Sequence, residues 1–286
     1  MELYDLHTHS YISDGTLSPA ELVQEAHKSG LTALALTDHD ATFGCTEAAD
    51  EAARLGIKLI PGVEISAADF HELHILGLGI DINSEGLKVE MEKCAKSRRE
   101  RVYKICDVLK EMGIVLDPEN IIRSAKYSVG KPHIAIEIAR MGYAKDKDEA
   151  YDKYLKTPEV KAVKKYKISC KTAAKLIHEA GGKVVLAHPH KIELEGISLE
   201  EFIRDFEGLD GIEAFYSEHT HEQAKELLEY AEKYNLLISC GSDFHGSNKP
   251  DIKLGTGIIG TDINGTLVSL RKQFPVDEER MIVSVL

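Results

Sequence analysis

Histidines dominate the polar chemistry of this 286-residue chain, which contains thirteen of them. His7 and His9 lie two residues apart in the segment DLHTH near the amino terminus. Side chains at positions i and i+2 of an extended segment leave the backbone on the same side, so these two imidazoles can share one metal ion. Asp243 and His245 repeat this spacing in the segment GSDFH, far along the chain.

Further candidate ligands lie at the edges of other short apolar runs. Asp14 lies in the loop after His9, and Glu64 closes the run IPGVE. Three more histidines adjoin the runs LALTD, ILGLG and LAHP, namely His39, His74 and His188. A carboxylate such as Glu64 can bridge two cations. Imidazoles and carboxylates without a thiolate suit zinc, manganese or iron better than magnesium or calcium, which prefer oxygen ligands.

The simplest alternative is that each histidine is an ordinary polar group. A lone strand-end histidine is more often a hydrogen-bonded core or surface residue than a ligand. Six histidines and three acids on one predicted face are different, because burying so many polar groups without ions would be costly. The pattern therefore predicts a centre for two or three divalent metal ions.

Repeated strand and helix signals position these residues. Residues 1–82 alternate short apolar runs with amphipathic segments, a rhythm typical of mostly parallel strand-helix units. Ser18 and Pro19 open one predicted helix, and Gly30 and Gly56 close two. In a parallel barrel the downstream ends of all strands meet on one face. We expect the six histidines at or near those ends.

The middle of the chain has a different character. Residues 83–165 are charged and helical, with no strand-like run, and are expected to form a helical cap or insertion. Residues 166–286 return to the first rhythm, as in KVVLAHPH and LLISCGSDFH. The sequence therefore predicts an α/β barrel made of residues 1–82 and 166–286, interrupted by the cap.

Composition excludes several classes of protein. The chain has no basic and apolar leader and no run of about eighteen apolar residues, which predicts a soluble, cytoplasmic protein that does not bind membranes. Its five cysteines are scattered and never form a CxxC pair, which argues against disulfides and thiolate zinc. A net charge of -13 disfavours long duplex nucleic acid. The sequence contains no signal for an oligomeric state.

Six segments together resemble the motifs of the PHP (polymerase and histidinol phosphatase) superfamily. They are DLHTHSYISDGTLSP, ALTDHD, PGVEIS, LHILGLGID, LAHPH and GSDFHG, and they span nearly the whole chain. The resemblance implies a distorted (β/α)7 TIM-like barrel with up to three metal ions. It also implies which residues hold each ion. One ion would be held by His7, His9, Glu64 and Asp243, a second by Glu64, His74 and His188, and a third by Asp14, His39 and His245.

Two positions need comment. Many similar proteins have a histidine where this chain has Asp14, a change that keeps a ligand but alters the metal preference. His71 competes with His74, but His74 lies inside the strand pattern and His71 in the preceding turn. His74 is therefore the expected ligand.

Clustered divalent cations activate water and stabilise a phosphate during in-line displacement, so hydrolysis of a phosphomonoester is the expected reaction. The chain most resembles the subgroup that removes the 3'-phosphate of nucleoside 3',5'-bisphosphates, some members of which also shorten RNA oligonucleotides from the 5' end. A small phosphorylated substrate is therefore expected. Asp243 is expected to take part in catalysis. His219, the last residue of the segment GIEAFYSEH, is a candidate proton donor or else a surface histidine.

The cap carries the candidate substrate contacts. Arg98 and Arg101 lie on one predicted helix, and Lys131 and His133 lie in GKPH at a predicted helix start, a place that suits phosphate. Similar capped phosphoesterases have a G-[RK]-P-H segment there. The alternative for the two arginines is a solvated helix face. The basic run 153–171 either borders the entrance or is itself a solvated face.

Four rival functions remain. A histidinol-phosphate phosphatase would share the metal site and differ in the cap. A proofreading exonuclease would need a longer nucleic-acid track than the net charge favours. An amidohydrolase also begins with HxH in a barrel, although TDHD and PGVE favour PHP proteins. A non-catalytic metal-binding protein would bind metal without hydrolysing any phosphoester.

Overall fold

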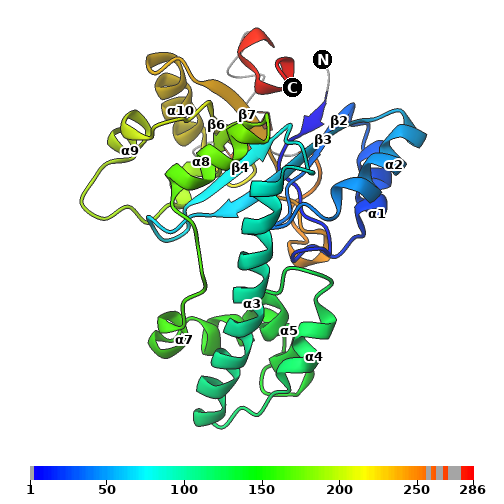
Figure 1. The fold of residues 1–286 in the computed structure, drawn as a ribbon, viewed down its shortest axis with the longest axis vertical. Coiled ribbons are helices and arrows are strands. Elements are labelled where there is room, and N and C mark those ends of the chain that lie inside the picture. Colours follow the sequence, from blue (N-terminus) through cyan, green and yellow to red (C-terminus); the bar gives the residue numbers. More distant parts are fainter. Residues whose placement is uncertain (1–2, 256–258, 262–266, 270–277) are drawn as a thin grey trace.

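The protein consists of a barrel and a helical cap joined by one long helix (Figure 1). The fold is that of a computed structural model, which describes residues 3–255, 259–261, 267–269 and 278–286. The barrel occupies the upper part of Figure 1 and the cap the lower part, and the carboxyl terminus lies at the barrel end away from the cap. No helix among the described residues is long and apolar enough to cross a membrane.

Seven strands form the barrel wall in their order along the chain. They are β1 (Tyr4–Asp5), β2 (Ala33–Leu36), β3 (Lys58–Ser66), β4 (His74–Leu78), β5 (Lys183–Leu186), β6 (Gly211–Tyr216) and β7 (Leu237–Gly241). The wall closes between β7 and β1, where the Leu6 amide donates to the Cys240 carbonyl at 3.0 Å. The Asp243 amide likewise donates to the His7 carbonyl at 2.9 Å. The expected distorted seven-stranded barrel is therefore confirmed.

One strand runs against the expected direction. β4 is antiparallel to both β3 and β5, whereas the other neighbouring pairs are parallel. We expected His74 at the downstream end of a strand, but it is the first residue of β4. It still reaches the common face, because the start of an antiparallel strand lies beside the ends of its neighbours. His74 pairs directly with Ser66, the last residue of β3.

Helices cover the outside of the barrel. They are α1 (Pro19–Lys28), α2 (Cys45–Leu55), α8 (Cys170–Glu179), α9 (Leu199–Asp205) and α10 (His221–Lys233). The expected signals bound the first two: Ser18 and Glu21 form a capping box at the start of α1, and Gly56 ends α2 with φ at 73°. Strand side chains such as Leu76 and Val185 pack with Ile177 of α8 in a fully buried core.

The cap is a small helical bundle. It contains α3 (Glu85–Glu111), α4 (Pro118–Ser124), α5 (Lys131–Arg140), α6 (Lys147–Ala150), the π-helical turn η1 (Tyr151–Leu155) and α7 (Pro158–Ala162). The first half of α3 packs on the barrel core through Leu87 and Met91, and its second half packs on a separate cap core through Ile105 and Leu109. This helix therefore belongs to both cores.

Short elements complete the chain. A two-stranded antiparallel ribbon pairs β8 (Ile259–Thr261) with β9 (Leu267–Ser269). The described residues include four 3-10 turns, namely η2 (Pro189–Lys191), η3 (Gly246–Asn248), η5 (Glu278–Arg280) and η6 (Ile282–Ser284). The turn η3 matters most for function, because it follows the GSDFH segment directly.

Candidate metal centre

Glu64 lies at the centre of a histidine cluster on the barrel face toward the cap. Its carboxylate is fully buried. Oε1 lies 2.8 Å from His74 Nδ1 and 3.0 Å from His188 Nε2. Oε2 lies 2.7 Å from His39 Nδ1, 3.2 Å from His9 Nε2 and 3.4 Å from His7 Nε2. Five imidazoles from the ends of four strands therefore surround one carboxylate.

Two more carboxylates complete the cluster. Asp243 Oδ1 lies 3.2 Å from His9 Nε2, 3.6 Å from His7 Nε2 and 3.4 Å from His245 Nδ1. Asp14 Oδ1 lies 3.2 Å from His245 Nε2 on the outer side. The structure thus brings together all nine ligands that the sequence analysis named, whose roles as ligands remain a prediction.

The nine residues form four overlapping groups in which ligand atoms lie within 4.8 Å of one another. The groups are His7, His9 and Asp243; His7, Glu64 and His188; His39, Glu64 and His74; and His9, Asp14, His39 and His245. We call the last of these the third group, because it contains Asp14, His39 and His245, the residues expected to hold the third ion. Zinc bonds of about 2.1 Å in a tetrahedral site would separate neighbouring ligand atoms by about 3.4 Å. The separations given above, mostly 3.0 to 3.6 Å, therefore fit shared ions.

Unpaired buried atoms also fit metal ligation. Within this part of the described chain, several fully buried side-chain atoms have no hydrogen-bond partner: His7 Nε2, His9 Nε2, Asp14 Oδ1, His39 Nδ1 and Glu64 Oε2. Leaving buried polar atoms unpaired is costly. Because these atoms face one another across the cluster, divalent cations between them would satisfy them together.

The charges of the cluster favour cations. Although burial raises their pKa values, neighbouring histidines hold the carboxyl pKa values of Asp14 and Glu64 well below the usual range. The pKa of Asp243 is held equally low against burial, chiefly by Lys249 and then by His245 and His7. Burial lowers the pKa of His74 to about 4, so its imidazole is neutral near pH 7. Burial also opposes the charged forms of His7 and His9, but the nearby carboxylates outweigh it, raising the pKa of His9 to about 9 and that of His7 well above its usual value, so a metal ion would displace protons from these two rings. Ionised carboxylates and neutral imidazoles are the forms that bind metals.

Glu213 contacts two residues of the cluster, His7 and His188, and was not predicted from the sequence. It is fully buried inside the apolar strand β6, and its Oε1 lies 3.1 Å from His7 Nδ1. Its Oε2 accepts from the His188 amide at 2.7 Å. A carboxylate on one ring nitrogen fixes the tautomer and leaves the other nitrogen free to bind a metal. The signal was a single acid inside the run GIEAFY.

A second missed set holds Asp243. Tyr216 is fully buried, and its hydroxyl donates to Asp243 Oδ2 at 2.9 Å. Lys249 Nζ donates to the same oxygen. Oδ1 is left to face His7 and His9. The Asp243 carboxylate is therefore fixed on one side and available on the other.

Backbone strain and close packing also mark the site. His188 and Asp243 have φ of 29° and 56°, in the left-handed region that non-glycine residues seldom adopt. A Cβ added at Gly241 would lie 2.2 Å from His7 Cβ and 2.5 Å from Glu213 Oε1. Only glycine lets the end of β7 approach His7 and its supporting carboxylate so closely.

His219, the candidate proton donor, lies beside the cluster rather than in it. Its ring is 5.1 Å from that of Tyr216, and its Nδ1 is 3.2 Å from the Ala214 carbonyl oxygen. Burial lowers its pKa to about 3, so the ring is neutral near pH 7. With the Nδ1 proton donated to Ala214, Nε2 carries no proton to give. His219 is only 3% exposed, so the alternative of a surface histidine is wrong. The role of proton donor would need a proton on Nε2 and remains a prediction.

The cap arginines have partners that neither expectation foresaw. Arg98 is only 7% exposed, so it is not on a solvated face, and its Nε donates to Asp40 Oδ2 at 2.9 Å. Lys165, in the basic run 153–171, reaches the same oxygen at 2.8 Å. Arg101 is partly buried and donates to the Val163 carbonyl at 3.1 Å.

The GKPH segment lies where the sequence predicted, at the start of α5. Lys131 Nζ donates to the Leu155 carbonyl at 3.0 Å, and His133 Nδ1 accepts from the Gly130 amide at 3.2 Å. His133 is near enough to the cluster for the Asp14 carboxylate to raise its pKa, although burial lowers it more. A role in substrate binding remains a prediction for both residues.

One cavity among the described residues lies away from the cluster. It holds about 1150 Å³ between α2, the start of α3 and the cap loop before α5. Phe43 and Tyr127 stack across it with ring centroids 5.5 Å apart, and none of the nine predicted ligands lines it. Aromatic faces of this kind can stack bases, but Glu47 and Glu92 on its wall oppose phosphate.

Comparisons with known proteins identify the family of this chain. A PHP domain model matches residues 5–249. A 5'-3' exoribonuclease from Haemophilus influenzae is 36% identical over 245 residues, which are 85% of this chain and 89% of that protein. A 3',5'-nucleoside bisphosphate phosphatase from Chromobacterium violaceum is 35% identical over 246 residues, which are 84% of this chain and 86% of that protein.

Solved structures agree with this placement. An amidohydrolase from Chromobacterium violaceum with bound sulfate and no metal has a TM-score of 0.79 at 34% identity, covering 88% of this chain and 89% of that one. A predicted metal-dependent phosphoesterase from Bifidobacterium adolescentis has a TM-score of 0.79 at 29% identity, covering 89% and 91%. The domain match spans most of the chain and includes all nine clustered residues. This protein is therefore a member of the PHP domain family.

Proposed function

We propose that this protein is a metal-dependent phosphoesterase that removes the 3'-phosphate of nucleoside 3',5'-bisphosphates and also accepts short RNA oligonucleotides. The observation that carries the proposal is the buried convergence of five imidazoles and two further carboxylates around Glu64. The names of the Haemophilus and Chromobacterium relatives support the nucleotide-type substrate.

We assign two or three divalent ions, manganese, zinc or iron, to the overlapping groups of ligands. Glu64 would be shared between ions, because its two oxygens face different histidines. When bound, such ions activate water and stabilise charge on the attacked phosphate. The buried ligands and their supporting residues hold this arrangement fixed before a substrate arrives, so little reorganisation is needed during the reaction.

The cap would supply charges for the rest of the substrate. Burial, together with the nearby Arg101, lowers the pKa of Lys131 to about 8. Burial also lowers the pKa of Lys167. An anion bound between half-buried cations that repel one another stabilises their charged forms. We therefore propose that a substrate phosphate binds near Lys131 and Arg101.

Arg98 fits a substrate contact less well than these residues do. Its Nε and Nη2 are already engaged by the Asp40 carboxylate. We retain Arg101, Lys131 and His133 as the proposed substrate contacts and give Arg98 a separate role below.

Phosphate release from a panel of substrates tests the proposal. The panel holds a nucleoside 3',5'-bisphosphate, mononucleotides, histidinol phosphate, a short 5'-phosphorylated RNA and an amide. Release of mononucleotides is measured for the RNA and release of the amine for the amide, because neither cleavage frees inorganic phosphate. The protein is reconstituted with Mn²⁺ or Zn²⁺. Asp243→Ala removes a carboxylate of the cluster, and Asp251→Ala, an exposed acid of the same loop region, is the matched control.

Selective release from the bisphosphate, abolished in Asp243→Ala and kept in Asp251→Ala, is the expected result. A preference for histidinol phosphate would retain the reaction and overturn the substrate. Hydrolysis of the amide alone would make the protein an amidohydrolase. Tight metal binding with no turnover of any substrate would leave a metal-binding protein without this activity.

A further inference from the structure

A buried cluster of charges joins the cap to the barrel next to the third group. Asp40 Oδ2 accepts from Arg98 Nε at 2.9 Å and from Lys165 Nζ at 2.8 Å, and Asp40 Oδ1 accepts from the Ser66 amide at 2.9 Å. Lys165 also donates to Ser66 Oγ at 3.0 Å. We call Asp40, Ser66, Arg98 and Lys165 the junction cluster.

The junction cluster is positioned to fix a candidate ligand. Asp40 directly follows His39, and its φ of 49° turns the chain sharply at this point. The Asp40 amide donates to the Glu64 carbonyl at 2.8 Å, and His39 pairs with Glu64 across a β-bridge. The backbone strain persists only where surrounding contacts hold it. Here the contacts come from both ends of the cap.

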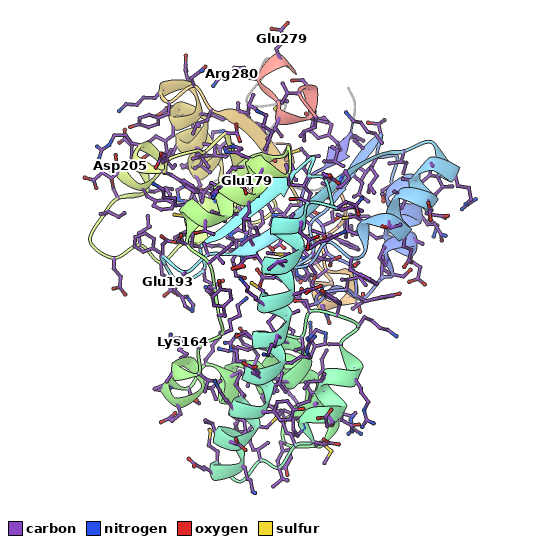
Figure 2. The ribbon with its side chains drawn as sticks, in the orientation of Figure 1. Lys164, Glu179, Glu193, Asp205, Glu279 and Arg280 are labelled. Carbon is purple, nitrogen blue, oxygen red and sulfur yellow. The ribbon has the colours of Figure 1, made fainter. Side chains whose placement is uncertain are left out.

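Arg98 lies on the helix α3 that enters the cap, and Lys165 lies on the segment that returns from it. Figure 2 shows the neighbouring Lys164 on this return segment, across from α3. The side chains of Asp40, Arg98 and Lys165 are 1%, 8% and 7% exposed. The charged ends of Arg98 and Lys165 are therefore occupied by the barrel rather than presented to solvent.

The cap also touches the other two loops of the third group. The Ser128 amide donates to the Ile12 carbonyl at 2.7 Å, two residues before Asp14. Lys147 Nζ donates to the Asn248 carbonyl, three residues after His245. The Asn248 side-chain amide in turn donates to the Asp14 carbonyl at 2.7 Å.

We infer that Asp40, Arg98 and Lys165 are positioning residues for the third group, and that cap docking and metal binding by His9, Asp14, His39 and His245 stabilise each other. The inference rests on the proposed function, because it concerns an ion of that same site. Its basis is that the cap contacts every loop that carries Asp14, His39 or His245. Two events that share these loops are coupled, and the coupling acts equally in both directions.

Metal binding without substrate tests the inference. Mn²⁺ binding to Arg98→Met is measured by equilibrium dialysis with metal analysis, beside the wild type and Arg99→Met. Arg98→Met leaves Asp40 paired with Lys165, and Arg99 is an exposed residue of the same helix. Losing a group that orients a ligand weakens metal binding by about 10- to 100-fold. We expect this loss for one Mn²⁺ ion only, the ion whose binding Asp14→Ala also weakens, and no change in Arg99→Met.

A second measurement follows the coupling from the side of the cap. In the wild type, filling the Mn²⁺ site that Asp14→Ala weakens should slow tryptic cleavage at the exposed Lys164. In Arg98→Met this protection should require a correspondingly higher Mn²⁺ concentration. If circular dichroism shows that Arg98→Met does not fold, Lys165→Met, which keeps the Arg98 pair, is measured in the same way.

An unchanged Mn²⁺ isotherm in the folded variant would overturn the inference. Cleavage at Lys164 that does not respond to Mn²⁺ in the wild type would also overturn it. Mn²⁺ binding and tryptic cleavage are both measured without substrate. The absence of phosphatase activity would therefore reject the proposed function without changing the interpretation of these two measurements.

Discussion

Replacing Glu213 by glutamine should weaken metal binding although no candidate ligand is removed. The carboxylate accepts from His7 Nδ1 at 3.1 Å and from the His188 amide at 2.7 Å. Hydrogen bonds to a charged group contribute about 1.5–3 kcal/mol each and neutral ones about 0.5–1.5 kcal/mol. The amide also offers only one acceptor oxygen where two donors converge. A loss of roughly 1–3 kcal/mol follows, which is about 10- to 100-fold in affinity.

Isothermal titration of Mn²⁺ into the metal-free protein measures this loss. Glu213→Gln should bind Mn²⁺ about 10- to 100-fold more weakly than wild type. Glu232→Gln, an exposed acid on α10, should bind as wild type does. Thermal unfolding of both variants without metal separates an effect on the ligands from a general loss of stability. An unaltered Mn²⁺ affinity in a folded Glu213→Gln variant would refute the argument that this carboxylate orients His7.

Three further predictions follow from packing and pKa shifts. Gly241→Ala places a methyl group 2.2 Å from His7 Cβ, so it should abolish tight Mn²⁺ binding. Gly86→Ala, whose added carbon meets Leu176 at 3.3 Å and Glu179 at 4.0 Å, should bind Mn²⁺ normally in the same titration. Burial lowers the pKa of His219 to about 3. Between pH 6.5 and 3 this histidine is therefore protonated in the unfolded chain and neutral in the native state. The free energy of unfolding should fall by up to about 1.4 kcal/mol for each unit by which the pH is lowered over this range. Urea titrations of metal-free His219→Asn should show a shallower acid slope, and an identical slope would contradict the assignment. Burial raises the pKa of Cys45 to about 12, so mass spectrometry after brief iodoacetamide treatment of the native protein should find the half-exposed Cys170 modified first, and prior modification of Cys45 would contradict its burial.

The sequence predicted the barrel and the composition of the candidate site well, for identifiable physical reasons. Apolar runs with period two and helices bounded by caps are local signals, as at Ser18 and Gly56. The HxH and DxH spacings at His7 and Asp243 are also local. Each of these signals can be recognised from a few neighbouring residues. The resemblance to one family then indicated that they belong to a single site.

The direction of β4 and the partners of the cap could not be read in this way. An apolar run such as HILGL looks the same in a parallel or an antiparallel strand, so His74 reached the expected face by an unexpected route. Arg98 looked like a surface or substrate residue because its partner, Asp40, is 58 residues away.

What the sequence determined by itself was therefore the kinds of residue present and the elements that carry them: histidines and acids at strand ends, in a barrel interrupted by a helical cap. The tertiary structure decided which atoms face each other. It placed Glu64 among five imidazoles, Glu213 beneath His7, and Asp40 between two cations of the cap. These relations depend on contacts between residues distant in sequence, and such contacts form only when the chain closes on itself.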